Sequence, residues 1–245
     1  MKKLIVALLL AAVPLLGLAA GGGVHLDDAD IDVSDQASLQ RGAKFFVNYC
    51  LSCHSAKFQR YNRMAKDLGL TEDEVKENLM FTTDKIGDTM QIAMSPENAE
   101  AWFGTAPPDL SLIARSRGVD WVYTYLRSFY VDEKRPFGVN NVVFKDVGMP
   151  HVMWELQGMQ KAVFHEVDGQ QVVEKLVPVE GAAGKGKMSA EEFDGAMRDL
   201  TAFLSYVGEP IQLERKRIGM WVLLFIGIFF VLAYLLKKEY WKDIH

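Results

Sequence analysis

The stretch Cys50-Leu51-Ser52-Cys53-His54 decides how the rest of this 245-residue chain is interpreted, because it holds both of the cysteines. Cys-x-x-Cys-His is the pattern typical of covalent attachment of a c-type haem. The two thiols lie about one helical turn apart, a spacing that suits the two vinyl groups of the porphyrin. The adjacent His54 is then held over the iron as its proximal ligand.

Two other interpretations of the cysteine pair stay open. An exported protein can use Cys-x-x-Cys as a redox-active disulfide, although no thioredoxin-like βαβ pattern surrounds this pair. A structural zinc ion needs four ligands, and the sequence has no second Cys/His pair at a suitable spacing. Haem attachment is favoured because the motif stands in a chain with an export signal.

An electron-transfer haem also needs a second axial ligand, and the 11 methionines leave several candidates. Met149 is favoured because Pro150 disfavours helix at the residue before it, so that the Met149 side chain would project from irregular backbone. The alternatives are a second histidine, His151, or one of the methionines Met153, Met90 and Met94.

The two ends of the chain have the features of an export signal and of a membrane anchor. Residues 1–19 combine a basic start, an apolar run and small residues, a pattern typical of a secretory signal peptide. Residues 218–236 contain no charge and, at roughly 1.5 Å per residue, would span about 28 Å, close to a bilayer core. We therefore expect residues 20–210 in the periplasm and residues 237–245 in the cytoplasm, with a single pass through a bacterial inner membrane.

The composition excludes several classes of protein. Hydrophobic residues make up 49% and charged residues 24% of the chain, which fits neither intrinsic disorder nor a polytopic membrane protein. A net charge of -5 without a basic cluster argues against nucleic-acid binding. Two cysteines are too few for a disulfide scaffold.

Between the ends, the pattern predicts a mainly helical domain with one β-hairpin. Helices are predicted at residues 38–49, from Thr71 within a mobile or helical excursion over 57–79, at 109–117, at 120–129 and from Ser189 onward. The two helices at 109–117 and 120–129 each open with an aspartate. Strands at 162–167 and 171–177 flank Asp168-Gly169, while 137–157 is predicted as a loop and 180–187 as a flexible linker.

Gly42 and Phe46 lie one helical turn apart, just before the cysteine motif. A glycine inside a helix costs about 1 kcal/mol, so its presence here predicts a close crossing by another helix. The expected partner is the helix that begins at Ser189, through Leu200 and Leu204.

Pro107 and Pro108 form a rigid segment before Asp109-Leu110-Ser111. Prolines lack an N–H donor, so the carbonyls of this segment are free to accept from a ligand imidazole. The alternative interpretation is that Pro-Pro followed by Asp is simply the start of a helix.

In their order along the chain, these motifs resemble the cytochrome c1 family, the haem-bearing subunits of quinol–cytochrome c reductase. The resemblance covers essentially the whole mature chain. It rests on Gly42 and Phe46, on Cys50 to His54, on Pro107 to Ser111, on Arg115-Ser116-Arg117, on Gly148-Met149-Pro150 and on the C-terminal anchor.

The resemblance implies a mainly α, class I cytochrome c-like haem domain with inserted loops and a small β-hairpin, plus a C-terminal transmembrane helix. It implies one covalent haem c and assigns roles to eight residues. Cys50 and Cys53 would carry the thioether bonds, and His54 and Met149 would be the axial ligands. A carbonyl of Pro107 or Pro108 would orient His54. Arg117 would contact a haem propionate, and Trp121 would line the haem. The sequence departs from the family at Trp102-Phe103-Gly104, where many relatives carry Asn, and it has no extra cysteine pair to stabilise the ligand loop.

The implied function is electron transfer within a dimeric reductase complex. The haem would take an electron from the Rieske iron–sulfur protein, a partner of cytochrome b, and pass it to a soluble cytochrome c. Acidic residues in the lead and at Glu72-Asp73-Glu74 would steer a basic acceptor or are simply solvated charge. Two alternatives stay open: a free-standing membrane-anchored cytochrome c that shuttles electrons between other complexes, and a haem sensor or peroxidase with an open iron position.

Overall fold

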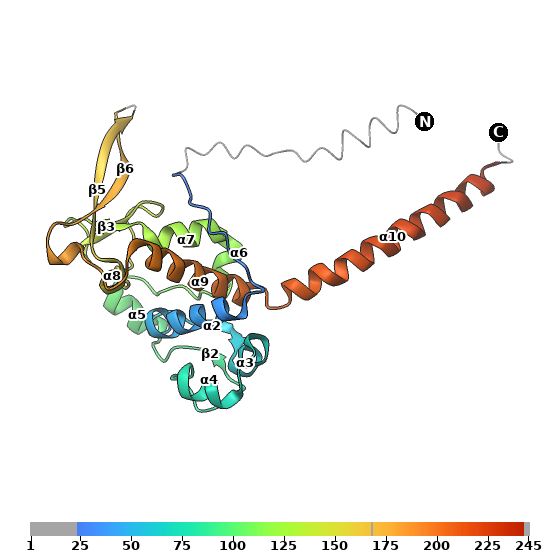
Figure 1. The fold of residues 1–245 in the computed structure, drawn as a ribbon, viewed down its shortest axis with the longest axis horizontal. Coiled ribbons are helices and arrows are strands. Elements are labelled where there is room, and N and C mark those ends of the chain that lie inside the picture. Colours follow the sequence, from blue (N-terminus) through green and yellow to red (C-terminus); the bar gives the residue numbers. More distant parts are fainter. Residues whose placement is uncertain (1–23, 168, 243–245) are drawn as a thin grey trace.

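The computed structural model describes residues 24–167 and 169–242. Figure 1 shows a body of packed helices from which a hairpin projects on one side and a long C-terminal helix on another. The predicted signal peptide, residues 1–19, and Asp168 of the predicted turn lie outside the described residues.

The elements follow one another as helices interrupted by three short antiparallel strand pairs. The helices are α2 (Gln36–Phe45), the π-helical turn η1 (Phe46–Cys50), α3 (Tyr61–Leu68), α4 (Glu72–Asn78), α5 (Pro96–Phe103), α6 (Ile113–Arg117), α7 (Val119–Arg127), α8 (Trp154–Gln157), the 3-10 turn η2 (Ala182–Gly184), α9 (Ala190–Gly208) and α10 (Gln212–Tyr240). The strand pairs are β1 (Ala56–Arg60) with β2 (Thr89–Met90), β3 (Phe129–Val131) with β4 (Val139–Asn141), and β5 (Gln160–Val167) with β6 (Gln170–Pro178). The mainly helical fold and the hairpin around residues 168–169 are therefore confirmed.

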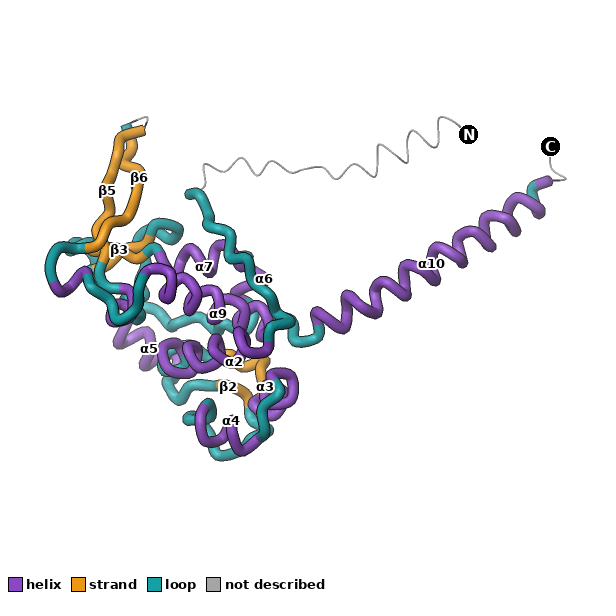
Figure 2. The backbone as a smooth tube through the Cα atoms, viewed as in Figure 1, coloured by secondary structure: helices purple, strands orange, loops and turns teal. Residues whose placement is uncertain are grey.

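Helices α2 and α9 lie side by side at the centre of the body (Figure 2). A Cβ on Gly42 would overlap the carbonyl oxygen of Asp199 and lie 2.7 Å from the Cβ of Phe203, so only glycine permits this approach. The ring of Phe46 lies 5.6 Å from that of Phe203. The predicted crossing is confirmed, although the closest contacts are made by Asp199 and Phe203 rather than by the neighbouring leucines.

Helix α9 begins with the predicted capping box. Ser189 Oγ accepts from the N–H of Glu192, and the Glu192 carboxylate accepts from the N–H of Ser189. These two bonds satisfy N–H groups that a helix start otherwise leaves without partners. The apolar face predicted for this helix is buried and consists of Phe193, Met197, Leu200, Leu204 and Val207.

The two short helices before the centre of the chain do not begin at aspartates, so that prediction was wrong. The residue before α6 is Leu112 and the residue before α7 is Gly118. Asp109 instead accepts from the N–H of Lys57, and Asp120 accepts from the N–H of Ala29. Asp109 also accepts from the N–H of Ser111 before α6 begins, so each carboxylate joins distant parts of the chain without capping its own helix.

Two regions predicted as irregular are more ordered than expected. The span 137–157 contains β4 and α8 as well as loop. In the predicted flexible linker, a Cβ on Gly184 would overlap the carbonyl of Val179, and one on Gly186 would overlap the carbonyl of Leu156. The glycines of this segment permit close backbone packing, and they do not make it a flexible spacer.

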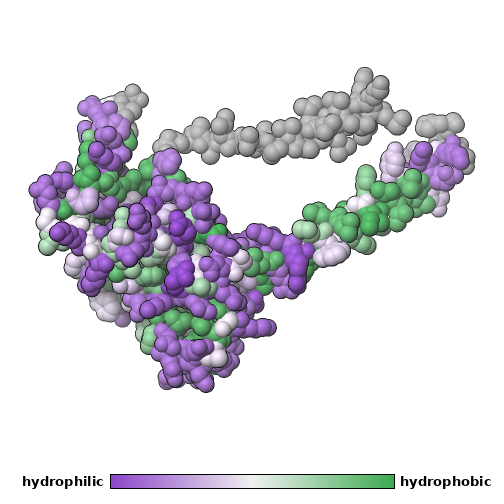
Figure 3. Space-filling view, in the orientation of Figure 1, coloured by the Kyte–Doolittle hydropathy of each residue, from purple (hydrophilic) through white to green (hydrophobic). Residues whose placement is uncertain are grey.

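Helix α10 is 29 residues long, and an 18-residue window within it has a mean hydropathy of 2.6 and no buried share, so the helix is long and apolar enough to cross a membrane. Figure 3 shows its apolar middle between polar ends. The predicted anchor at residues 218–236 lies within it. At the junction with α9, the Glu209 carboxylate pairs with Arg115 of α6 at 3.2 Å and with Arg215 of α10, which ties the start of α10 to the body.

Candidate haem-attachment site

The cysteine motif follows a change of helical geometry at the end of α2. The N–H of Leu51 donates to the carbonyl of Phe46 at 2.9 Å, five residues back, which is the bond of a π-turn. The carbonyl of Cys50 then accepts from the N–H groups of both Cys53 and His54, at 3.0 and 2.8 Å. The motif is therefore wound as a tight turn on a helix that packs against α9.

Both cysteines are free thiols, and Cys50 is buried whereas Cys53 is partly exposed. Burial, with the neighbouring Cys53, raises the pKa of the Cys50 thiol to about 12. A redox-active cysteine has a lowered pKa, so Cys50 lacks the property that the redox-disulfide interpretation requires. Among the described residues, no three His, Cys, Asp or Glu side chains gather as a metal site, so these residues offer no set of ligands for zinc.

His54 is nearly buried, and a backbone carbonyl fixes its ring. The Nδ1 atom lies 2.7 Å from the carbonyl oxygen of Pro108. Because a carbonyl only accepts, Nδ1 carries the hydrogen, and Nε2 is left with its lone pair. Burial lowers the pKa of His54, which keeps the imidazole neutral as a metal ligand must be.

The segment that supplies this carbonyl is itself held along the residues after His54. Leu110 donates its N–H to the carbonyl of Ser55 at 2.8 Å, and Phe58 donates its N–H to Ser111 Oγ at 3.1 Å. Together with the bond from Lys57 to Asp109, these contacts hold residues 108–111 against residues 55–58. The position of the Pro108 carbonyl is thus set by backbone on both sides.

A stripe of side chains four residues apart begins at the end of α6, continues along α7 and ends at the start of β3. The Arg117 guanidinium lies 5.2 Å from the ring of Trp121, which stacks on Tyr125 with centroids 5.0 Å apart. Tyr125 meets Phe129 edge-on at 5.2 Å. The spacing explains why Trp121 and Tyr125 share a face of α7, whereas Arg117 and Phe129 join them from α6 and β3. Within the described part of the chain Arg117 makes no ion pair, whereas the nearby Arg115 is paired with Glu209.

Met149 lies at the end of this stripe. Its Sδ accepts from the hydroxyl of Tyr125 at 3.3 Å, and its side chain packs against the small buried cluster of Phe129, Val139 and Val147. The sequence analysis missed Tyr125 and also Phe144, whose ring lies 6.3 Å from that of Trp121. The spacing Arg117, Trp121, Tyr125 was a signal that could have found the first of them.

The competing ligand candidates are packed differently. Met90 and Met153 are buried in the main core. The ring of His151 stacks on Phe129 at 5.0 Å, and its buried Nε2 has no hydrogen-bond partner among the described residues. Burial lowers the pKa of His151 to about 4, so this imidazole is neutral at physiological pH.

These residues fit a covalently attached haem. Among the described residues there are two free thiols, an imidazole whose Nδ1 is bonded and whose Nε2 is not, a half-buried thioether and a guanidinium without a carboxylate partner. The structure brings His54 to Pro108, and Arg117 through Trp121 and Tyr125 to Met149. Pro107 is not the residue whose carbonyl meets His54.

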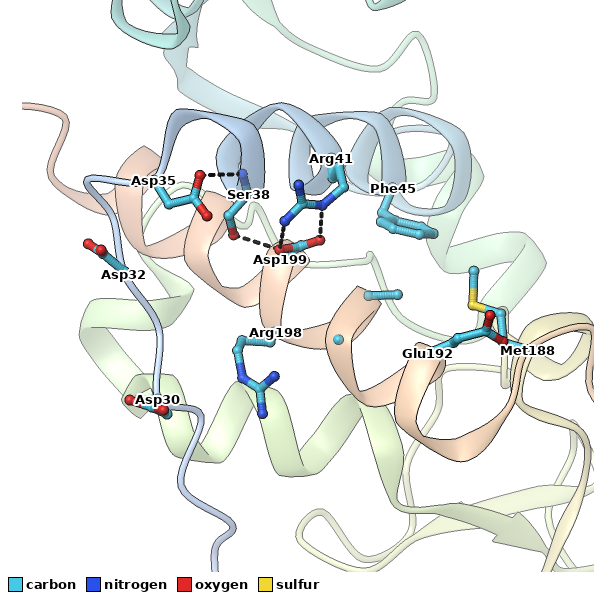
Figure 4. A pocket seen from close by; sticks show the side chains of 12 residues that line it. Asp30, Asp32, Asp35, Ser38, Arg41, Phe45, Met188, Glu192, Arg198 and Asp199 are labelled. Atoms are coloured by element: carbon cyan, nitrogen blue, oxygen red, sulfur yellow. Dashed lines mark hydrogen bonds and ion pairs between the residues drawn. The ribbon is translucent and has the colours of Figure 1, made fainter.

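Two cavities lie away from these residues. One of about 570 Å³ lies between the N-terminal lead, α2 and α9, where Asp199 binds Arg41 and Ser38 (Figure 4). Another of about 510 Å³ lies at the base of the β5–β6 hairpin. None of the predicted haem residues lines either cavity.

Several known proteins are similar to this chain over its whole length. Cytochrome c1 of Allochromatium vinosum is 56% identical over 248 residues and is covered completely, as is this chain. A Nitrosomonas europaea protein named ammonia monooxygenase gamma subunit is 48% identical, over 100% of this chain and 98% of its own length. Cytochrome c1 of Rhodospirillum rubrum is 27% identical over 99% of this chain and 97% of its own.

One solved structure aligns with this chain over nearly its whole length, but the two folds superpose only loosely. A chain of a structure titled "Hyperthermophilic respiratory Complex III" aligns with 100% of this chain and 98% of its own length, at 15% identity and a TM-score of 0.45. The profile of the Cytochrome C1 family matches residues 28–244. By this match and by the full-length similarity to the Allochromatium protein, the chain belongs to the cytochrome c1 family.

Proposed function

We propose that this chain is the haem-bearing electron-transfer subunit of a quinol–cytochrome c reductase, respiratory complex III. It takes an electron from the Rieske iron–sulfur protein and passes it to a soluble cytochrome c. The observation that carries the proposal is the bond from His54 Nδ1 to the Pro108 carbonyl at 2.7 Å, in a chain of the cytochrome c1 family. Membership of that family implies a covalent haem c.

In this proposal the predicted residues hold the cofactor. Cys50 and Cys53 would form the thioether bonds, and His54 Nε2 and Met149 Sδ would be the iron ligands. Arg117 pairs with a propionate, because its guanidinium is stacked on Trp121 and has no carboxylate within the described part of the chain. The haem supplies one-electron redox chemistry.

The chain's own contribution is to orient these ligands and to keep water away from them. The Pro108 carbonyl fixes the plane of the His54 ring and increases the donor strength of Nε2. Beside Met149, the stacked rings of Trp121 and Tyr125 provide aromatic surface. No side chain is required to act as an acid, a base or a nucleophile.

We further propose that residues 1–19 are removed on export and that residues 20–210 form the periplasmic haem domain. Residues 218–236 cross the bacterial inner membrane once, and residues 237–245 form a cytoplasmic tail. The apolar surface of α10 supports the anchor. In the membrane the partners are cytochrome b and the Rieske protein, in a complex that is dimeric.

Two observations favour a fixed place in a complex over a free-standing shuttle. The hairpin β5–β6 projects from the body (Figure 1), and helices α3 and α4 add a separate layer that a minimal shuttle does not need. The Nitrosomonas relative bears the name of an oxygenase subunit, so association with an oxygenase is the second candidate to be tested.

Purification of the full chain from membranes in mild detergent tests this function. Copurification with a two-haem cytochrome b and a Rieske protein is the expected result. Isolation as a single haem polypeptide would favour the shuttle, and copurification with an oxygenase would favour the second candidate. Ready binding of CO to the reduced protein would favour the sensor or peroxidase.

A further inference from the structure

Tyr125 is the one residue whose side chain donates directly to the candidate ligand sulfur among the described residues. Its hydroxyl lies 3.3 Å from Met149 Sδ, and no other described residue forms a hydrogen bond with that hydroxyl. A thioether sulfur has two lone pairs and is a weak acceptor. A bond on one lone pair leaves the other free for a metal.

The hydroxyl is held in place by the packing of its own ring. One face of Tyr125 stacks on Trp121 at an interplanar angle of 12°, and Phe129 meets the ring edge-on. The Tyr125 carbonyl accepts from Asn141 Nδ2 at 2.8 Å, which ties α7 to β4.

We propose that Tyr125 is a positioning residue for the axial ligand: its hydroxyl bonds one lone pair of Met149 Sδ, aims the other at the iron and raises the reduction potential of the haem. This inference rests on the proposed role of Met149 as a ligand.

The direction of the effect follows from the charge of the iron. Ferric iron requires more electron donation from its ligands than ferrous iron does. A hydrogen bond to the thioether withdraws density from the sulfur and weakens that donation, so it disfavours the ferric state more than the ferrous one. Hydrogen bonding around ligand atoms is a recognised means of tuning potential.

Tyr125→Phe is the direct test, because phenylalanine keeps the ring between Trp121 and Phe129 and removes only the hydroxyl. The matched control is Tyr123→Phe, on the same helix, whose buried ring lies 4.4 Å from the Arg127 guanidinium and belongs to the main core, whereas Met149 packs against the smaller cluster. The haem c potential of each full-length protein is measured by optical redox titration. The far-red band of ferric thioether-ligated haem is recorded in parallel.

In Tyr125→Phe the equilibrium constant for reduction is expected to fall by about three- to tenfold, a tenfold change being 59 mV for one electron, and the far-red band is expected to shift. Tyr123→Phe is expected to leave both unchanged. An unaltered potential in Tyr125→Phe, or an equal change in the two variants, would overturn the inference. If the unsubstituted protein has no far-red band, Met149 is not the ligand, and it is that part of the proposed function that fails.

Discussion

On one side of the candidate haem site His54 is held by backbone, whereas on the other side Met149 is held by side chains. The carbonyl that meets His54 belongs to a segment bonded along residues 55–58, next to the main core. Met149 lies in irregular chain between Gly148 and Pro150, against a cluster of three buried residues and one tyrosine hydroxyl.

The difference teaches how a single domain can fix one ligand and adjust the other. A backbone carbonyl is present whatever the side chain, so the His54 contact depends on the path of the chain. The Met149 contact depends on the identity of Tyr125 and on a few apolar neighbours. We therefore expect substitutions around Met149 to change the reduction potential of the haem. Only substitutions within Cys50–His54 are expected to prevent haem attachment.

The largest effect is expected from the thiols. Replacing Cys50 and Cys53 by serine removes both vinyl partners, so no haem can be attached covalently. The denatured full-length protein is then expected to lack haem staining after electrophoresis, while the unsubstituted protein stains. Retention of stain by the double variant would exclude the cysteine motif as the attachment point.

Met149→Leu is expected to leave the covalent haem in place but to change its electronic state. Loss of the thioether removes a ligand that raises the potential, so the equilibrium constant for reduction should fall by about a hundredfold or more, roughly 120 mV. The far-red band should disappear, and the reduced form should bind CO. Met153→Leu is the control, because this buried methionine is assigned only to packing.

Low pH is expected to destabilise the fold around Met149, because His151 becomes protonated. A histidine whose folded pKa is lowered to about 4 from 6.5 binds its proton more tightly when unfolded, so stability is full above about pH 6.5 and is lost as pH falls toward 4. The free energy of unfolding falls by at most about 3 kcal/mol over this pH range.

Urea unfolding at a series of pH values checks this expectation. His151→Phe keeps a ring against Phe129 and should flatten the profile between pH 6.5 and 4. The exposed His165, substituted by Gln, serves as the control. A profile equally steep in His151→Phe would rule out His151 as the cause.

The smallest effect is expected in the helix crossing beneath the cysteine motif. Gly42→Ala places a methyl group against the Asp199 carbonyl and should cost roughly 1–3 kcal/mol of unfolding free energy. Gly195→Ala on α9 meets nothing within 4 Å and should instead stabilise the helix by up to about 1 kcal/mol. Urea denaturation compares the two, and equal effects would show that the crossing is not close.

The features that sequence reasoning anticipated are those with local causes. The capping box at Ser189, the turn at Gly169 and the apolar face of α9 each depend on residues a few positions apart. The glycine at position 42 was informative because it is costly inside a helix without a reason. The resemblance to the cytochrome c1 family followed from the order of several such motifs along the chain.

The remaining features depend on contacts between distant residues. Asp109 and Asp120 look like helix caps, but each carboxylate accepts from a backbone N–H that lies 52 or 91 residues away in sequence. Which of the two prolines faces His54 depends on how residues 108–111 align with residues 55–58. Tyr125 meets Met149 across 24 positions, a pairing that no local pattern encodes.

The π-turn at the end of α2 decides which way the cysteine motif faces. Each residue of an α-helix advances the chain by about 100° around the axis, at 3.6 residues per turn. The turn from Phe46 to Cys50 accommodates one residue more than an α-helical turn. Deleting one residue there would rotate everything beyond it by roughly that angle and swing the thiols to another side of α2. The direction in which the two thiols and His54 face is thus set by a single surplus position in the winding of one helix.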